Sequence, residues 1–600
     1  MSSNLQITAD QNTVPMGRSV CITAQLDVHG EAASSYLLLP FVNDRRWGAH
    51  ERPDDAGQAV FLLPLPNPGP ARIQVIALPA NDDPKRHAAG WMGLQPPDLL
   101  LAGKRMPAGG GAELCRSNIL EIEVAWRNFP RPANSPSTEP ETLFGMQWEP
   151  WFSGGAPRWG TSPAAPVTGF YDSYNREVTR QHILWFMDLG VDFILPDWTN
   201  HLWDKQHWDE RHEGVNAIVH ATTLFLEILA EMREEGLPVP KVALFPGLSN
   251  GRPATMQALN EELAWIYHTY VRNPRFKGLW QEFDGKPLMV VLDTGAVGDR
   301  RGRAEDAFRV PFFKHTLEMS AAELDAFRAA QPPVDDSQFT IRWMSSQNET
   351  TRHHELGYWS WMDGTLQPPV AYHNGRAEAA TASVACFHAL GWTAPTAYGR
   401  RGGATYLETF RVALQHRPRV VFLHQFNEFS GQRDGQGMGP NRDIYADSYS
   451  VELSDDIEPV SLRAPGYRGD GGWGYYYLNL TQALMAVYRG DTDSTLLAVS
   501  SPLAGTQVAG EMLQVAWTTL KNAPGAPQRF TVLVDGQAVL TGVEAHEAQV
   551  SLAGLQPGAH TLTIIAEGAT TRYPLSSTEL DIPNAALPVS VNVPIMVQKA

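Results

Sequence analysis

Several carboxylate side chains in this sequence stand directly after short apolar runs. The clearest is Glu428 in RVVFLHQFNEF (419–429), where Phe426 and Phe429 flank the dipeptide Asn427-Glu428. Burying a carboxylate without a partner costs on the order of several kcal/mol, so such a residue is either paired or used in chemistry. Apolar surroundings also raise the pKa of a carboxyl group, which suits a proton donor. Glu428 is therefore the first catalytic candidate.

Other predicted strands also end in carboxylates, amides and tryptophans. Each such residue has a plainer explanation, such as a helix cap, a turn or a solvated loop, but their repetition at successive strand ends favours one shared site. The catalytic candidates are Glu428, Glu149 and Asp197. The candidates for substrate binding are Trp148, Trp151, Trp198, Asn200, Arg342, Trp343, Trp361, Asp363, Asn427 and Gln432.

This combination of side chains is typical of carbohydrate chemistry. Sugar rings stack their C–H faces on aromatic rings, and their hydroxyls bond to Asp, Asn and Arg side chains. Cleavage of a glycosidic bond needs two carboxyl groups, one to protonate the leaving oxygen and one as base or nucleophile. The chain supplies 18 Trp, 17 Tyr and 23 Phe. The pattern predicts a site for a poly- or oligosaccharide that uses no cofactor and no metal.

The middle of the chain, residues 142–495, alternates short apolar segments with amphipathic ones. This alternation predicts an α/β fold, a (β/α)8 TIM barrel with its chemistry at the carboxyl ends of the strands. Helices are predicted near 176–189, 215–235, 255–272, 314–330 and 406–416. The predicted strands lie within 142–150, 190–200, 241–247, 287–295, 339–346, 358–364, 380–388 and 419–429.

The two ends of the chain have a different pattern of apolar and polar residues from the middle. Residues 1–126 alternate apolar and polar positions between turn residues, which predicts an immunoglobulin-like β-sandwich domain. Residues 127–141 are rich in Pro, Ser and Glu and read as a linker. Residues 496–600 return to strand patterns, with a hairpin turn at Asp535-Gly536. We expect this part to be a second sandwich of the immunoglobulin or fibronectin type.

Composition excludes several classes of partner. The formal charge of −18 argues against nucleic acid, whose phosphates would be repelled. No apolar run reaches the roughly 18 residues of a membrane span. The first residues show no signal peptide, so a cytoplasmic location is expected, or a secreted or periplasmic one if a signal has been removed. The three cysteines show no zinc-like spacing. The sequence does not indicate an oligomeric state.

Three short motifs in order suggest a known family. They are FNEF (426–429), DIEP (456–459) and GYYYLNL (474–480), and together with residues 171–200 they resemble the family 99 glycoside hydrolases over about 141–490. The resemblance implies a (β/α)8 barrel that cleaves α-mannosidic linkages internally with retention. Glu428 matches the first glutamate of the family's eighth-strand motif, and Gly431 occupies the position of the second. The resemblance leaves Glu149, Asp197, Asp363 and Asp434 as possible partners of Glu428.

Two other functions fit the same pattern. A non-catalytic carbohydrate-binding protein would explain the absent second glutamate, and a lyase or transferase would use Tyr or His as its base. The acidic stretch 441–459 lacks the spacing of an EF-hand loop and is predicted to be a solvated loop. The basic, Gly-rich stretch YGRRGG (398–403) lacks the strand and helix context of a phosphate-binding loop. His353-His354-Glu355 is predicted to lie on the surface.

Overall fold

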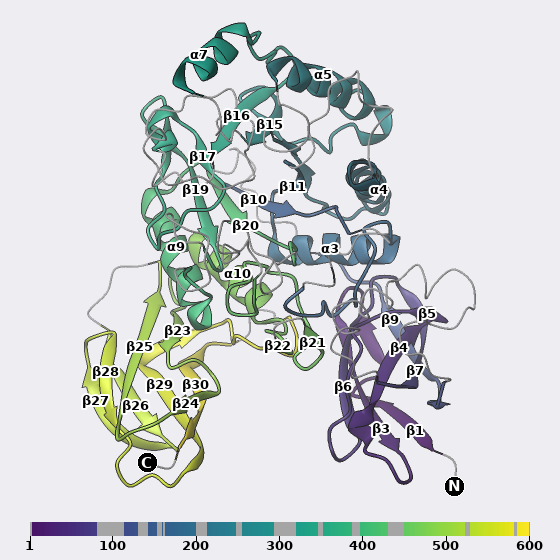
Figure 1. The fold of residues 1–600 in the computed structure, drawn as a ribbon, viewed down its shortest axis with the longest axis vertical. Helices are drawn as coiled ribbons and strands as arrows, with labels where there is room; N and C mark the ends of the chain where they lie inside the picture. The colour runs from purple at the N-terminus through teal and green to yellow at the C-terminus, as the bar shows by residue number, and fades with distance from the viewer. Residues whose placement is uncertain are drawn as a thin grey trace.

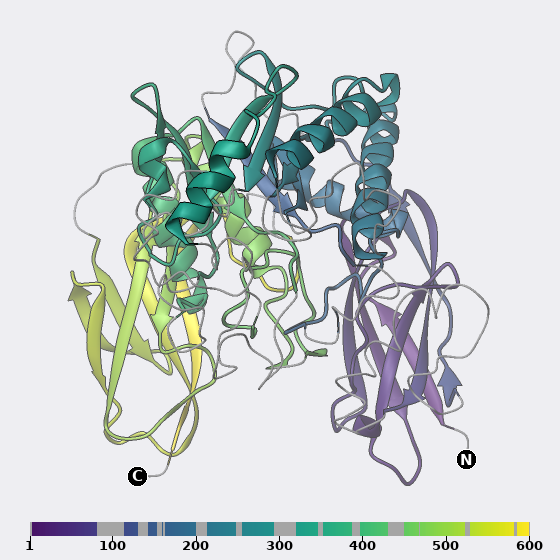
Figure 2. The ribbon, with the colours of Figure 1, turned by 45° about the horizontal axis from the view of Figure 1, so that its top comes forward.

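The chain folds into a central α/β region with a β-rich region at each end (Figure 1). Both β-rich regions lie on the same side of the central region and apart from each other (Figures 1 and 2). The predicted mixed α/β class is confirmed. The computed structural model describes residues 3–80, 113–129, 142–152, 159, 162–199, 213–247, 255–292, 320–345, 352–386, 397–429, 449–466, 469–522, 528–580 and 585–598.

Most strands of the central region lie in or overlap the predicted segments, whereas Glu282–Phe283 and Ala371–His373 lie outside them. The strands are β10 Leu143–Trp148, β11 Phe193–Trp198, β12 Lys241–Val242, β13 Phe245–Pro246, β14 Glu282–Phe283, β15 Lys286–Leu292, β16 Thr340–Ser345, β17 Trp359–Ser360, β18 Ala371–His373, β19 Arg376–Ser383 and β20 Val420–His424. One sheet has the order β12-β11-β10-β20-β19-β18, with β13 beside β11, and the other has the order β14-β15-β16-β17. All pairs except β14 with β15 and β18 with β19 are parallel.

The two sheets meet at both of their edges. Isolated parallel bridges pair Leu244 with Met289 and Gly247 with Leu292, next to β13 and β15. At the other edge the hydroxyl of Thr381 on β19 donates to the carbonyl of Ser360 on β17. No ladder joins β17 to β19 among the residues described. The strand order is the one a (β/α)8 barrel requires, and its closure into such a barrel stays a prediction.

Helices follow most of these strands. Asn175 caps α3 by accepting from the backbone N–H of Glu177 at 3.0 Å, and Gly190 ends it at φ 71°. Prediction and structure agree closely for α3 and α9, whereas the described part of the segment predicted at 314–330 is helical only from 321. The helices are α3 Arg176–Leu189, α4 Glu213–Glu234, α5 Met256–Ile266, α7 Ala321–Ala330, α9 Ala404–His416 and α10 Tyr476–Tyr488.

The parallel strands separate two apolar layers. Successive side chains of a strand point to opposite faces. Alternate residues such as Leu195, Val290 and Phe422 form a core enclosed by the strands. Their neighbours, such as Ile194 and Val421, pack in the larger core that includes the helices. This period of two decides which residues at the strand ends face the interior.

The N-terminal region consists of two sheets that share apolar core residues. One has the order β1-β3-β6 and the other the order β2-β9-β7-β4-β5, with β8 beside β7. Their strands are β1 Asn4–Ala9, β2 Thr13–Pro15, β3 Ser19–Asp27, β4 Tyr36–Val42, β5 Arg45–Arg46, β6 Gln58–Pro64, β7 Gly69–Pro79, β8 Cys115–Arg116 and β9 Leu120–Ala125. The assignment of this region to the immunoglobulin type stays a prediction. The linker also stays a prediction, because residues 130–141 lie outside the described part of the chain.

The C-terminal region also has two sheets, around a core of its own. The hairpin at Asp535-Gly536 is confirmed, with φ of 49° and 78° at the two turn residues. The sheet orders are β23-β25-β28 and β24-β30-β29-β26-β27. The strands are β23 Leu496–Ser501, β24 Thr506–Val508, β25 Met512–Leu520, β26 Phe530–Val534, β27 Gln537–Val543, β28 Glu547–Ser551, β29 Gly558–Thr571 and β30 Leu587–Val597. None of the described helices could span a membrane.

Candidate active site

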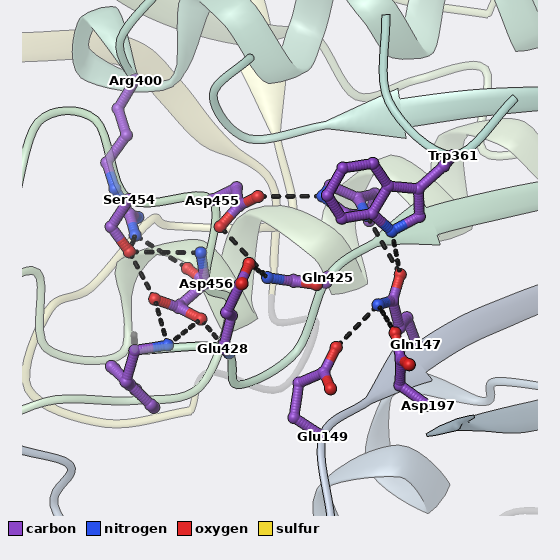
Figure 3. A network of polar contacts seen from close by, with 12 residues as sticks. Gln147, Glu149, Asp197, Trp361, Arg400, Gln425, Glu428, Ser454, Asp455 and Asp456 are labelled. Carbon is purple, nitrogen blue, oxygen red and sulfur yellow. Dashed lines mark hydrogen bonds and ion pairs between the residues drawn. The ribbon is translucent and has the colours of Figure 1, made fainter. Parts of the chain in front are cut away.

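Gln147, buried near the carboxyl end of β10, is the centre of a polar network (Figure 3). Its amide nitrogen donates to Glu149 Oε1 and to Asp197 Oδ2, each at 2.6 Å. Its amide oxygen accepts from the indole Nε1 of Trp361 at 2.9 Å. The network therefore joins three predicted site residues, from the ends of β10 and β11 and from the segment after β17.

His424, the last residue of β20, extends the network to a second group of carboxylates. Its Nδ1 lies 3.2 Å from Gln147 Oε1 and its Nε2 lies 2.9 Å from Asp455 Oδ2. Because the two carboxylates and Trp361 fix the orientation of the Gln147 amide, both ring nitrogens of His424 face acceptors. His424 is fully buried, so these contacts take the place of water around its ring.

Glu428 lies just beyond the end of β20 and is 8% exposed. Its carboxylate accepts a hydrogen bond from Gln425 Nε2, which lies 3.4 Å from Asp455 Oδ1. The backbone N–H groups of Glu428 and Phe429 both donate to Asp456 Oδ1. Phe429 has a φ of 49°, a left-handed conformation that bulky residues rarely adopt. The carboxylate of Asp456 thus holds the backbone that presents Glu428.

The guanidinium of Arg400 binds the segment that contains Asp456. One guanidinium nitrogen, Nη2, donates to Ser454 Oγ at 3.0 Å and to the Asp456 carbonyl at 2.8 Å. The guanidinium carbon lies 3.6 Å from the ring centroid of Trp473 and 4.1 Å from that of Tyr477. Ser454 Oγ in turn donates to Asp456 Oδ2 at 2.6 Å. The YGRRGG stretch therefore contributes a buried structural arginine.

The acidic segment that ends at 459 is not a solvated loop where the structure describes it. Asp455, Asp456 and Glu458 are all buried, with at most 1% of each residue exposed. Glu458 accepts from the Tyr171 hydroxyl at 2.8 Å and lies 3.1 Å from His182 Nε2. The prediction of a solvated loop is wrong for these residues, because each carboxylate has partners that replace water.

Asn427 positions the backbone next to Glu149. Its Oδ1 accepts from the Glu149 N–H at 2.8 Å, and its Nδ2 donates to the Glu149 carbonyl at 3.2 Å and to the Tyr171 hydroxyl at 2.8 Å. The residue is fully buried. These contacts engage both ends of the amide, so the predicted role of Asn427 in holding a substrate hydroxyl is not supported. The same contacts bring the backbones of Glu149 and Glu428 together.

The electrostatics of the site centre on Asp197. Burial raises the pKa of Asp197 to about 6, although the hydrogen bonds from Thr199 act in the opposite direction. Its carboxyl also hydrogen-bonds with that of Glu149. When two carboxyl groups are adjacent and have little access to solvent, ionising both costs additional free energy because the two negative charges repel. The Glu149–Asp197 pair is therefore suited to hold one proton up to about pH 6.

Some of the other predicted site residues are buried in the described structure, and some lie outside the described part of the chain. Asp363 lies beyond the end of β17, is buried, and accepts from the Ser360 hydroxyl. Trp361 is half-buried and packs edge-on against His424. Trp151 is buried beside Phe152. Asn200 and Gln432 lie outside the described residues, and so does Asp434.

Three predicted tryptophans face the helices or the outer loops instead of the site. The indole of Trp148 donates to His182 Nδ1 at 3.1 Å, and that of Trp198 donates to Thr222 Oγ1 at 2.9 Å. Trp343 stacks on Tyr358. Their positions correct the prediction that they bind substrate. The reason is the period of two in the strands, which turns Trp148 outward between the inward-facing Gln147 and Glu149.

Arg342, which the sequence predicts to bind substrate, also lies away from the site. It lies in the first half of β16, toward the amino-terminal ends of the strands and away from the carboxylate network. Its guanidinium pairs with Glu378 and Asp284, each at 2.6 Å, and Arg419 pairs with the same two carboxylates. These four ion pairs lie near the amino-terminal ends of β16, β19 and β20, so the structure does not support a role for Arg342 in substrate binding.

Gln147, His424, Gln425 and Asp455 were not predicted as site residues. The apolar runs that contain the first three carried a usable signal, because a polar residue within such a run must have a buried partner. Among the described residues no group of three or more His, Cys, Asp or Glu side chains could hold a metal ion. His353, predicted at the surface, is buried and its Nδ1 lies 3.0 Å from Ser345 Oγ.

Comparisons with known proteins give only distant similarities. No protein-family model matches the chain, and no curated protein matches it.

Similar solved structures include the GH99 endo-alpha-mannosidase from Bacteroides thetaiotaomicron, at 15% identity and a TM-score of 0.36 over 59% of this chain and 98% of that one. A beta-glucuronidase from Bacteroides uniformis matches at 9% identity and a TM-score of 0.34, over 99% of this chain and 61% of that one. The endo-beta-1,4-mannanase from Thermotoga petrophila matches at 11% identity and a TM-score of 0.28, over 77% and 92%. Similarity of this degree decides neither the family nor the activity.

Proposed function

We propose that this protein is a glycoside hydrolase that cleaves a poly- or oligosaccharide by carboxylate acid–base chemistry. The observation that carries the proposal is the convergence of Glu428 and the Glu149–Asp197 pair, held by Asn427 and Gln147 at the carboxyl ends of β10, β11 and β20. Glycosidic cleavage needs two carboxyl groups in different protonation states. The site provides two carboxyl positions with different surroundings.

The two positions suit different roles. The Glu149–Asp197 pair, in which burial raises the pKa of Asp197 to about 6, supplies the proton for the leaving oxygen. Glu428, whose carboxylate accepts from Gln425, acts as the second carboxylate, either as base or as nucleophile. Trp361, half-buried against His424 and bonded to Gln147, provides an aromatic surface at the network.

Glu428→Gln tests the proposal directly. The substitution keeps the shape of the side chain and removes the carboxylate, so turnover should fall at least about a hundredfold. Native protein and variant are incubated with a panel of polysaccharides and aryl glycosides. Chromatography identifies the released sugars, and NMR of the anomeric proton shows whether configuration is retained or inverted.

The panel also separates the alternative functions. Full activity of Glu428→Gln on a substrate that the native protein cleaves would refute the assignment of Glu428. A product that absorbs in the ultraviolet would indicate a lyase. Binding of a polysaccharide with no turnover by either protein would indicate a carbohydrate-binding protein that has no catalytic activity.

A further inference from the structure

A cleft of about 1090 Å³ lies between the central region and the C-terminal region. Helix α9 and the residues around β18 form one wall, and strand β25 with His546 forms the other. Arg411 on α9 crosses between the walls and donates to the Thr519 carbonyl at 2.5 Å. Because β18 pairs with the amino-terminal half of β19, the cleft lies away from the strand ends that carry the carboxylate network.

Tyr372 offers an exposed aromatic ring in this cleft. The residue is 47% exposed, although most aromatic side chains of the central region are buried. Its hydroxyl lies 3.1 Å from His416 Nδ1, and this hydrogen bond limits rotation of the side chain. A ring that is held in place and open to solvent is a surface on which the C–H face of a sugar can stack.

The polar lining of the cleft is close to neutral in charge. Glu408 pairs with Arg401 at 3.6 Å and Glu355 pairs with Arg352. Burial, followed by the charge of Arg411, lowers the pKa of His546, which favours its neutral form. The remaining polar groups are mainly amides, hydroxyls and imidazoles, namely Gln367, Gln415, Thr518, Thr519, His354 and His416. Such a lining suits a neutral ligand that is rich in hydroxyl groups better than a phosphate or a cation.

The opposite wall contains a polar atom that lacks a partner. Trp517 is 3% exposed, and within the described part of the chain its indole Nε1 has no hydrogen-bond acceptor. Buried N–H groups are nearly always satisfied in folded proteins.

We propose that this cleft is a second carbohydrate-binding site, which holds a neutral oligosaccharide segment by stacking on Tyr372. The class of ligand rests on the proposed function. Pockets for small ligands have volumes of about 300–1,000 Å³, so the cleft is large enough for several sugar units. Its position away from the carboxylates means that it would retain a polymer without taking part in bond cleavage.

Tyr372→Ala in the Glu428→Gln background measures retention without turnover. Affinity electrophoresis is run in gels that contain α-mannan, galactomannan, xyloglucan, dextran or, as an acidic comparison, polygalacturonate. We expect retention by at least one neutral polymer, and Tyr372→Ala should weaken it about tenfold. Trp126→Ala removes another exposed aromatic side chain, from the N-terminal region, and should leave retention unchanged.

The outcomes separate this site from the catalytic one. Equal retention of the protein with and without Tyr372→Ala would overturn the proposal, and so would no retention by any of the neutral polymers. Retention that depends on Tyr372 would support the cleft even if the native protein cleaved nothing, a result that counts only against the proposed hydrolase activity. In otherwise native protein, Tyr372→Ala should leave turnover of a small aryl glycoside unchanged and raise KM for the retained polymer.

Discussion

At the scale of single residues, the Glu149–Asp197 pair sets an expected pH dependence. Because burial raises the pKa of Asp197 to about 6, the pair is protonated below that pH and loses its proton above it. A general acid works only while protonated, so kcat/KM should fall as pH rises through about 6. The pH dependence of kcat/KM on a substrate from the panel checks this expectation.

Asp197→Asn should lower activity in a way that depends on the leaving group. A glycoside with an alkyl leaving group needs protonation, and its turnover should fall about a hundredfold or more. A dinitrophenyl glycoside needs little help from an acid and should lose far less. Glu149→Gln, compared under the same conditions, shows which member of the pair delivers the proton. Equal losses for both leaving groups would exclude the pair as the proton source.

The sequence was sufficient to predict some of these residues and not others. Glu428, Glu149 and Asp197 stand at the ends of apolar runs, where an unpaired charge would be too costly, and the structure joins all three through one hydrogen-bonded network. Trp148 and Trp198 stand beside these carboxylates in the sequence, but side chains of a strand alternate between its two faces, so both tryptophans point outward.

At the scale of elements, the segment 454–458 is a structural support for the end of β20. Asp456 accepts from two backbone N–H groups and from Ser454 Oγ, so removing its side chain leaves three buried donors without a partner. Each loss costs about 1–3 kcal/mol. We expect Asp456→Ala to lower the free energy of unfolding by at least about 3 kcal/mol and to reduce kcat, measured by denaturant unfolding and initial rates.

The conservative variant tests whether the hydrogen bonds are the cause. Asp456→Asn keeps one carbonyl oxygen that can accept from Glu428 and Phe429, so it should retain most of the stability that Asp456→Ala loses. Equal effects of the two variants would point to the negative charge beside Arg400 instead. The sequence could not predict this support, because burial of the segment depends on partners such as Arg400 that are distant in the chain.

At the scale of the whole molecule, the N-terminal region packs directly against elements of the site. The Ala49 N–H donates to the Val167 carbonyl at 3.2 Å, and the Val167 N–H donates to the Pro459 carbonyl at 2.9 Å, one residue beyond Glu458. A Cβ on Gly169 would lie 2.7 Å from the Gly48 carbonyl oxygen, so this approach requires glycine. The strands at both ends of the chain could be predicted from the sequence. Their contact with the central region could not, because contacts between domains leave no periodic pattern in the sequence.

Glu51 makes this contact sensitive to pH. It accepts from the Ser461 hydroxyl at 2.5 Å, and burial raises its pKa from 4.5 to about 8, although Ser461, Arg463 and Arg46 act in the opposite direction. The folded protein therefore binds this proton more tightly than the unfolded chain does. The resulting stability is complete below about pH 4.5 and is lost as pH rises toward about 8.

Glu51→Gln should remove that pH dependence, because the amide mimics the protonated carboxyl at every pH. Relative to the native protein, the variant should be similar in stability at pH 5 and more stable by up to a few kcal/mol at pH 8, since one pKa unit corresponds to about 1.4 kcal/mol. Denaturant unfolding at both pH values measures the difference, and Glu121→Gln on the exposed face of β9 controls for the loss of one charge. If Glu51→Gln changes stability equally at both pH values, the carboxyl does not titrate across this range, and the contact between the two regions does not respond to pH through Glu51.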